Sequence, residues 1–405
     1  MELLSETDIQ TIHKQCSLSK KNIQKWYITD YSDNLVGYLG EHLSLFFETE
    51  SERRKFFIKC VPRFNSFRAN YVRETAFFNK EYIMLSKLFQ NFRDNDGLQK
   101  WRPKLLYVKE ELFVFEDVTE IGYIMPSNLS TLTYNEILAT IAALARFHAQ
   151  SWIHEEEKSI ELDRPYRLWE DYADYLSEPE RGQPWRDTGM RAVIDFLKIY
   201  SKFRTKHNFE EIVNVKIPEL YKIAEKLMKP SIKYRNVVVH RDVWSNNIFL
   251  KTLDNGKMHA LLVDYQTVLY CAPAIDLSAL IYLNTTKQFR LKYTKKMIDF
   301  YYEVLCVELK LEDIDITSMI SKCNFVESYT ESLAFGMTQA ALVIPMIAMS
   351  DDQRKEIFDN PETGAVLSEV SRSQEFIDVA KVNKTYKNRV IELFDDIVET
   401  FCIHQ

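Results

Sequence analysis

Glycine is scarce in this sequence, with nine among 405 residues. So few glycines exclude glycine-rich low-complexity segments and flexible glycine linkers. An excess of basic charge is also missing, because the formal net charge is −7. Proteins that bind nucleic acid through its phosphates concentrate lysine and arginine. We therefore expect no nucleic-acid partner.

The six cysteines contain no Cys-x-x-Cys pair, which argues against a zinc site and against a disulfide framework. The first residues show neither a basic segment nor an apolar run of signal-peptide length. The most apolar later stretch, 340–349, is too short to span a bilayer and contains Pro345. These absences predict a cytoplasmic protein with reduced thiols and no membrane span.

What remains is the composition of an ordinary globular protein. Hydrophobic residues make up 46% of the chain and charged residues 27%, as in most soluble proteins. A chain of this length can bury more than one core. We therefore expect two lobes, each with a core of its own.

The strongest chemical signal is a set of motif residues beside two apolar runs. His240-Arg241-Asp242 follows three valines, Asn247 comes five residues after the aspartate, and Asp264 ends the next apolar run. Phosphoryl transfer from metal-bound ATP needs a carboxylate that accepts the proton of the acceptor hydroxyl, and oxygen ligands for the metal. This order of residues supplies both. It predicts Asp242 as the base and Asn247 and Asp264 as the Mg²⁺ ligands.

A β-hairpin would bring the two metal ligands together. The segments on either side of Asn255-Gly256 read as short strands, the first beginning at Asn247 and the second ending at Val263. With a two-residue turn, paired residue numbers add up to 511. Asn247 then lies opposite Asp264, with their Cβ atoms about 4.5–5.5 Å apart. Amide and carboxylate oxygens that converge in this way suit Mg²⁺, whereas a one-residue bulge would break the register.

These motifs resemble those of a known family. His-x-Asp-x-Trp-x-Asn-Asn from residue 240, Asp-Tyr-Gln from 264 and Ala-Pro-Ala-x-Asp-Leu from 272 are similar to the motifs of the ecdysteroid kinase-like (choline kinase-like) proteins of arthropods. That family is related to choline kinases and aminoglycoside phosphotransferases in the protein-kinase-like superfamily. It usually has glycine in place of Arg241 and phenylalanine in place of Tyr265. Neither change removes a catalytic group, but Arg241 puts a bulky cation beside the predicted base.

The resemblance implies an α+β, two-lobed protein-kinase-like fold with ATP bound between the lobes. The N-terminal lobe, residues 1–118, would hold the nucleotide and contain an antiparallel sheet and a helix. The C-terminal lobe, residues 119–405, would be larger and mostly helical, and would carry the catalytic and acceptor-binding residues. The resemblance covers nearly the whole chain, most specifically at 238–280 and least at 155–235.

Lys59 is the candidate ligand of the α- and β-phosphates. It lies inside the apolar strand predicted at 55–62, where a buried ammonium is costly unless it is paired. A solvent-facing strand lysine is the alternative, and the downstream motif favours phosphate binding. The helix predicted at 77–88 would supply its partner: Glu81 fits the family pattern and Glu74 is the fallback. A surface glutamate without a special role is the alternative for both.

Other nucleotide contacts follow from the resemblance. Gly37 and Gly40 interrupt a strand pair predicted at 35–47, where the family has the loop over the nucleotide phosphates, and glycine allows close backbone approach. An ordinary strand turn explains the same glycines equally well. The segment that contains Glu116 and Val118 resembles the connector between the lobes, whose main chain binds the adenine.

The rest of the chain reads as mostly helical. Thr133 and Glu136 form a capping box for a helix predicted to end near Trp152. His148 on the buried face of that helix is interpreted as a core histidine. Asp276 is expected to cap the helix after the motif and, by resemblance, to brace the catalytic loop. Further helices are predicted at 190–204, 217–228, 291–307, 314–337 and 383–401.

Residues 155–235 say least about function. The charged run 155–158 reads as solvent-exposed. Several aromatic residues of the region could line a pocket for a flat apolar acceptor, or they could simply pack in the core. They are Tyr166, Trp169, Tyr172, Tyr175 and Trp185.

Together the motifs and the resemblance predict an ATP- and Mg²⁺-dependent kinase of small molecules. No Ala-Pro-Glu segment follows Asp264, which argues against a protein kinase. The implied acceptor is a hydroxyl of an ecdysteroid or of another hydrophobic alcohol. A xenobiotic acceptor in detoxification, or choline, is an alternative, although the choline cation would need an aromatic or acidic cage. The competing class is a pseudokinase that binds a lipophilic ligand without catalysis, as Arg241 and the weak glycine loop would suggest.

Overall fold

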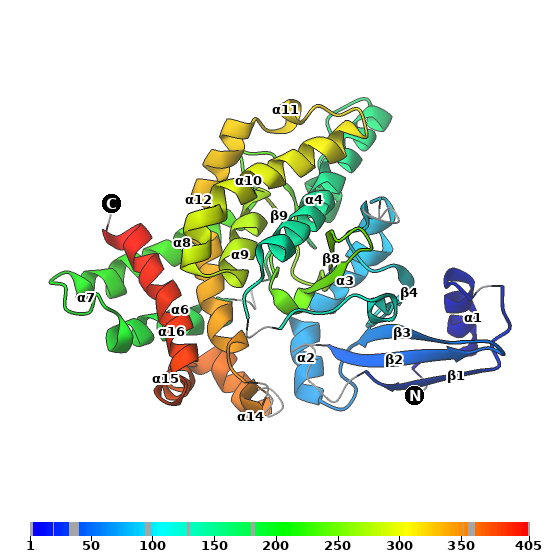
Figure 1. Cartoon of the computed structure of the whole chain (residues 1–405), viewed down its shortest axis with the longest axis horizontal. Coiled ribbons are helices and arrows are strands. Elements are labelled where there is room, and N and C mark those ends of the chain that lie inside the picture. The colour runs from blue at the N-terminus through cyan, green and yellow to red at the C-terminus, as the bar shows by residue number, and fades with distance from the viewer. Residues whose placement is uncertain are drawn as a thin grey trace.

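The computed structural model describes residues 3–18, 20–31, 40–93, 99–127, 130–179, 183–350, 352–354 and 361–403, apart from the side chains of residues 66, 67, 361 and 362. An antiparallel sheet with three helices forms the N-terminal part of the chain, and a larger helical part follows it (Figure 1). This is the predicted α+β architecture, with an antiparallel sheet in the N-terminal part and helices in the larger C-terminal part.

Five antiparallel strands form the N-terminal sheet in the order β1-β2-β3-β5-β4, at the right of Figure 1. The predicted strand around Lys59 is confirmed as β3, whereas Gly37 and the first half of the predicted strand pair lie outside the described residues. The five strands are β1 Lys25–Asp30, β2 Glu41–Glu48, β3 Arg53–Cys60, β4 Leu105–Lys109 and β5 Leu112–Glu116.

The two faces of this sheet have different surroundings. Leu45 and Ile58 point to one face, into a core that they share with helix α1 (Glu6–Gln15). Successive side chains of a strand point to opposite faces, so Lys59 points to the other face, where it is paired across the strands with His42. The alternation explains how an apolar strand accommodates a lysine, because the ammonium points away from the apolar core.

Two short helices lie between β3 and β4. Helix α2 (Ser66–Glu74) leads into α3 (Phe77–Ser86), whose Phe78 ring stacks on Phe113 of β5 at 5.4 Å between centroids. Glu81 lies in the middle of α3 and is buried. The helix predicted at 77–88 is therefore confirmed. Because it packs on the face that carries Lys59, its glutamate is brought to the lysine.

Helices make up most of the C-terminal part. Helix α4 (Tyr134–Leu162) begins at the predicted capping box, in which the Thr133 side chain accepts from Glu136 N and the Glu136 side chain accepts from Thr133 N. The other helices are α5 Trp169–Tyr172, α6 Gln183–Tyr200, α7 Phe209–Glu211, α8 Ile217–Leu227, α9 Ala274–Asn284, α10 Lys287–Lys310, α11 Ile316–Met319, α12 Lys322–Ile347, α14 Pro361–Ala365, α15 Ser373–Val382 and α16 Lys384–Ile397. Two small sheets pair β6 (Val237–Val239) with β9 (Leu269–Cys271) and β7 (Ile248–Thr252) with β8 (Met258–Leu262).

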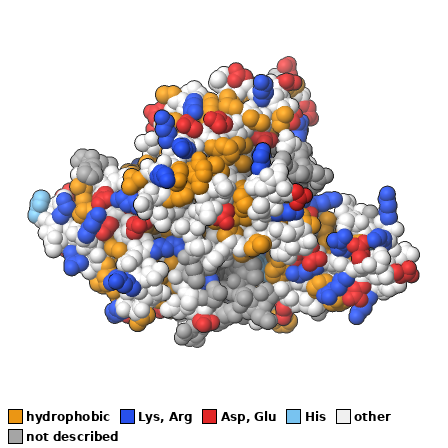
Figure 2. All heavy atoms as spheres, in the orientation of Figure 1, with side chains coloured by type: hydrophobic (Ala, Val, Ile, Leu, Met, Phe, Trp, Pro, Cys, Tyr) orange, Lys and Arg blue, Asp and Glu red, His pale blue; other side chains and the backbone are white. Residues whose placement is uncertain are grey.

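Between the two parts, β5 ends at Glu116 and a turn of 3-10 helix, Val118–Ile121, follows. The division of the chain at residues 118 and 119 stays a prediction. On the face shown in Figure 2, basic and acidic side chains are interspersed over both parts.

The charged run in α4 differs from the prediction. The helix continues to Leu162 instead of ending near Trp152, and Glu155 is completely buried. Its carboxylate accepts hydrogen bonds from Arg235 at 3.0 Å and from the hydroxyl of Tyr270. A buried carboxylate needs such partners, and here they come from segments far along the chain. The interpretation of this run as solvent-exposed was therefore wrong at Glu155.

Helix α12 also differs from the prediction. It begins at Lys322, eight residues after the predicted start at 314, and it continues through Pro345 instead of ending before it. By length and composition α12 is the one described helix that is apolar enough to cross a membrane. However, 78% of its most apolar window is buried inside the protein, as expected of a core helix.

Helices α9 and α12 approach each other closely at a glycine. A Cβ atom on Gly336 would lie 2.6 Å from the backbone carbon of Ser278 and 2.6 Å from its Oγ. The same hydroxyl donates to the Ser332 carbonyl at 3.0 Å. Helix α9 carries Asp276, so this contact helps to fix the helix from which Asp276 extends.

We predict that Gly336→Ala destabilises the protein by about 1–3 kcal/mol, because the added methyl group overpacks the contact. Alanine is the better helix former, so a loss of stability would be opposite in sign to the propensity effect. Denaturant unfolding measures the change, with Thr330→Ala on the exposed face of α12 as the control. A Gly336→Ala protein as stable as the wild type would contradict the close packing.

Candidate active site

The loop between β6 and β7 carries the predicted base, and a buried carboxylate of helix α9 fixes its backbone. The Asp276 carboxylate on α9 accepts hydrogen bonds from the backbone N–H groups of His240 and Arg241, the second at 2.7 Å. The His148 ring lies 3.0 Å from the same carboxylate through Nε2. Asp276 is completely buried, so these bonds fix the backbone just before Asp242. The expected helix cap was wrong, because α9 begins two residues earlier and has no side-chain cap.

Arg241 has a backbone conformation that suits glycine. Its φ of +71° lies in the left-handed region, which costs a residue with a Cβ atom about 1–2 kcal/mol. The two backbone bonds to Asp276 hold this conformation in place. The positive φ gives a physical reason why the family usually has glycine in place of Arg241. In this protein, arginine adopts the same backbone conformation.

The carboxylate of Asp242 is oriented by its own loop. Asn247 Nδ2 donates to Asp242 Oδ2 at 3.0 Å and to the Asp242 carbonyl at 2.8 Å. Trp244 Nε1 donates to the same Oδ2 at 3.3 Å. Burial, and then the nearby charge of Asp264, raise the pKa of Asp242 above its ordinary value. A raised pKa makes a carboxylate a better proton acceptor near neutral pH.

The hairpin has a different register from the predicted one. Ile248 pairs with Leu262, so Asn247 comes opposite Val263, whose N–H donates to the Asn247 carbonyl at 3.1 Å. The turn contains three residues instead of two, because Gly256 adopts a φ of +77°. A turn followed by a left-handed glycine is a common three-residue hairpin connection. The predicted pairing of Asn247 with Asp264 was therefore wrong by one residue.

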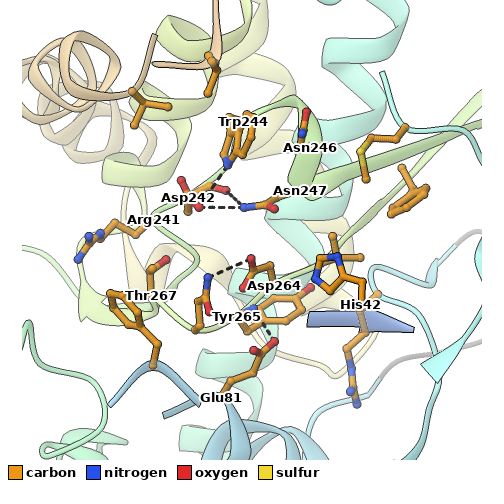
Figure 3. Close-up of a pocket in the computed structure, with 18 of the residues that line it drawn as sticks. His42, Glu81, Arg241, Asp242, Trp244, Asn246, Asn247, Asp264, Tyr265 and Thr267 are labelled. Carbon is orange, nitrogen blue, oxygen red and sulfur yellow. Dashed lines mark hydrogen bonds between the residues drawn. The ribbon is translucent and has the colours of Figure 1, made fainter. Parts of the chain in front are cut away.

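Asp264 nevertheless lines the same cavity as Asn247. In this register, strand alternation would send the two side chains to opposite faces, but Asp264 has a φ of +72° and the alternation ends there. Figure 3 shows Asp242, Asn247 and Asp264 around one space. The amide nitrogen of Asn247 points to Asp242, so its Oδ1 points away from that carboxylate. Both predicted metal ligands thus line one cavity, and the Asp264 carboxylate there accepts from Lys59 and Gln266.

Lys59 is held by two carboxylates from different elements. Its Nζ lies 2.5 Å from Glu81 Oε2 and 2.8 Å from Asp264 Oδ1, and it donates to Gln266 Oε1 at 3.4 Å. Burial alone would lower the pKa of Lys59, but Asp264 and Glu81 outweigh it and raise the pKa. The ammonium therefore stays charged. The structure places Glu81 against Lys59, whereas the fallback, Glu74, is exposed at the end of α2.

Of the remaining predicted contacts, Gly40 lies beside Lys59, and Gly37 is outside the described residues. A Cβ atom on Gly40 would lie 3.3 Å from Lys59 Cγ and Cε, so glycine makes room here for the lysine. Glu116 and Val118 line the cavity as expected of a connector. The sequence motifs missed His42, which also lines the cavity. Burial, and then the charge of Lys59, lower the pKa of His42 to about 4, so the ring is neutral. Only the pairing of β2 with β3 could have shown from the sequence that His42 lies beside Lys59.

A cavity of about 300 Å³ connects these residues. Residues of the sheet, of α2 and α3, of the connector, of the motif segment and of helices α6 and α12 line it. Of the five aromatic residues considered from the sequence, Trp185 lines the cavity, and the other four belong to the main core or pack against it. The alternative of ordinary packing thus holds for those four.

The motif residues lie in a segment that matches a family model. The model, described as the ecdysteroid kinase-like family, matches residues 42–313, more than half of the chain. The chain belongs to the ecdysteroid kinase-like family. The matched segment contains Lys59, Glu81, Asp242, Asn247 and Asp264, so the family assignment and the cavity concern the same residues.

Similar solved structures come from several kinases of small molecules. An ethanolamine kinase from Plasmodium vivax is 10% identical, over 95% of this chain and 91% of that one, with a TM-score of 0.42. A spectinomycin phosphotransferase is 11% identical over 98% and 99%, with a TM-score of 0.41, and a choline kinase from Streptococcus pneumoniae is 11% identical over 80% and 99%, with a TM-score of 0.37. Likenesses this distant say nothing about the substrate. No curated protein sequence matches the chain.

We predict that Asp276→Asn loosens the loop that carries Asp242. His240 N–H and Arg241 N–H donate to different oxygens of the Asp276 carboxylate, and asparagine keeps only one oxygen that can accept. Hydrogen exchange of peptides that cover 240–242 should become faster by about tenfold or more, since each lost buried bond costs about 1–3 kcal/mol. Peptides of β2 serve as the internal reference, and Asp378→Asn, on the exposed face of α15, is the control variant. Unchanged exchange at 240–242 would show that Asp276 does not brace the loop.

Proposed function

We propose that this protein is an ATP-dependent kinase that transfers the γ-phosphate to a hydroxyl of an ecdysteroid or a similar hydrophobic alcohol. One observation carries the proposal: Asp242, Asn247 and Asp264 line one cavity, and Lys59 bonds both Asp264 and Glu81. Membership of the ecdysteroid kinase-like family supports a small-molecule kinase. The apolar residues of α12 that line the cavity suit a hydrophobic acceptor.

In this mechanism Asp242 orients the acceptor hydroxyl and accepts its proton. Asn247 and Trp244 hold the carboxylate in place before the acceptor binds, so little reorganisation is needed. A positioned general base contributes about 10²–10⁴-fold to the rate. The raised pKa of Asp242 supports this role.

The donor set at the site fits Mg²⁺. Asn247 Oδ1 and the Asp264 carboxylate are hard oxygen donors, as Mg²⁺ requires. The described residues contain no group of three or more His, Cys, Asp or Glu side chains placed to hold a metal. That agrees with an ion held by one or two protein ligands together with phosphate oxygens and water. When bound, Mg²⁺ would neutralise charge on the transferred phosphoryl group.

Lys59 would contact the α- and β-phosphates of ATP. Glu81 keeps the ammonium in place from α3, while the bond between Lys59 and Asp264 would give way as the phosphates arrive. His42, neutral and beside Lys59, adds no charge to this part of the site. The six free cysteines are in keeping with a cytoplasmic location, which we include in the proposal.

The position of Arg241 does not support the pseudokinase alternative. Its side chain is directed away from Asn247 and Asp264 (Figure 3), and its Nη1 donates to Glu178. Arg241 therefore leaves the predicted base and the metal ligands in place. The kinase remains the function that this arrangement supports best.

The test is transfer of phosphate from Mg–ATP to a panel of ecdysteroids and other hydroxylated compounds, with products identified by mass. The wild type should add one phosphate to at least one acceptor. Asp242→Asn should lose about 10²-fold or more of this activity and still bind Mg–ATP within a few-fold of the wild type. Full activity of Asp242→Asn would remove Asp242 as the base, and failure of the wild type with every acceptor would contradict the proposed acceptors.

The same assay gives a pH prediction. Protonated Asp242 cannot accept the hydroxyl proton. The rate should therefore be maximal above the pKa of Asp242 and fall as the pH drops through that pKa. Because that pKa is raised, the acid limb of the kcat/KM profile should lie above the ordinary range of an aspartate. A profile that stays flat into that range would contradict the assignment.

A further inference from the structure

A second group of charged residues lines the same cavity. Glu178 stands between two arginines: its Oε2 accepts from Arg241 Nη1, and its Oε1 pairs with Arg186 of α6. All three residues line the cavity. The side chains of Arg186 and Arg241 are each only 9% exposed. One carboxylate thus serves two buried guanidinium groups.

This group is short of hydrogen-bond acceptors. Among the described residues, the Nε atoms of Arg186 and Arg241 are buried without a hydrogen-bond acceptor. Lys80, buried nearby, donates to the carbonyls of Ser177 and Val268 at 2.8 and 3.1 Å. Buried cations without enough partners are costly. An additional anion would therefore be stabilised here.

The pKa values agree with an excess of positive charge. Burial, and then the neighbouring Arg241, lower the pKa of Arg186 to about 10. Burial lowers the pKa of Lys80 to about 7; Glu178 raises it in part, and Arg241 lowers it further. Glu178, Glu225 and Asp187 raise the pKa of Arg186 in part, but in both cases burial and the neighbouring Arg241 outweigh the carboxylates.

Apolar residues stand beside the charged group. Trp185 precedes Arg186 on α6, and Val343, Met346 and Ile347 of α12 line the same cavity. Asp242 is the next residue after Arg241. An acceptor whose hydroxyl reaches Asp242 would therefore meet apolar side chains and the two arginines together.

We propose that the acceptor is a largely apolar hydroxylated acid, whose carboxylate or other acidic group pairs with Arg186 and Arg241 while its hydroxyl meets Asp242. This inference rests on the proposed kinase function and narrows its substrate class. An uncharged ecdysteroid would bring no negative charge to the two arginines. A cationic acceptor such as choline would meet the arginines without a free carboxylate, because Glu178 is already bound by both.

The test is equilibrium binding to protein saturated with Mg–ADP, measured by calorimetry with matched pairs of probes. Each pair consists of a carboxylic acid and its neutral primary amide: cholic acid with cholamide, and para-(hydroxymethyl)benzoic acid with its amide. The wild type should bind the acid about tenfold or more tightly than the amide, because bonds to a charged group are worth more than neutral ones. Binding is read without turnover, so an inactive enzyme would contradict the proposed function and leave this result standing.

Variants assign the preference to the charged group. Arg186→Gln should lose the preference for the acid, and Arg186→Lys should keep part of it because the charge remains. Arg191→Gln, an exposed arginine on the same helix, is the matched control and should keep the full preference. Glu178→Gln should bind the acids more tightly than the wild type, since both arginines lose their internal partner; a purely structural salt bridge would give no such gain.

Three results would overturn the inference. The first is the absence of an acid preference in the wild type, including no binding of any probe. The second is a preference that Arg186→Gln retains. The third is that Arg186→Gln weakens binding of Mg–ADP or inorganic phosphate while the ratio of acid to amide stays the same, which would assign the anion site to the phosphoryl group instead of the acceptor.

Discussion

The ammonium group of Lys59 connects three parts of the chain that are distant in sequence. The lysine comes from the N-terminal sheet, Glu81 from α3, and Asp264 from the end of the hairpin that follows the catalytic loop. An ammonium buried in this way is tolerated only because both carboxylates offset its loss of water. Removing either carboxylate would leave the ammonium with a single anionic partner and weaken this offset. The two ion pairs of Lys59 therefore hold the sheet, the helix and the hairpin together around the cavity.

A second constraint acts on the backbone of the catalytic segment. Arg241 and Asp264 both have positive φ angles, which residues with a Cβ atom adopt only when their surroundings hold them. At Arg241 the holding groups are the two hydrogen bonds to Asp276, and at Asp264 the bonds with Lys59 and Gln266 contribute. The strain turns the Asp264 side chain into the cavity. The site is thus built by contacts from outside the motif as much as by the motif itself.

The sequence predicted the fold class, the buried strand lysine, the capping box at Thr133 and the family, because each leaves a local pattern or an ordered motif. It failed where the outcome depends on distant partners. Glu155 reads as exposed because its partner Arg235 lies 80 residues away. The hairpin register failed because one glycine, Gly256, changes the length of the turn. The pairing of Glu178 with Arg186 and Arg241 has no signal in the sequence, since only the packed chain brings the three together.

The central claim is that Asp264 holds Mg²⁺ at a nucleotide site shared with Lys59. The most direct test is the dissociation constant of ATP with and without Mg²⁺, for the wild type and for Asp264→Ala. A metal held by the Asp264 carboxylate should make wild-type binding strongly dependent on Mg²⁺, and the variant should lose most of that dependence. Equal Mg²⁺ dependence in both proteins would show that Asp264 does not hold the ion, and would contradict the account of this site.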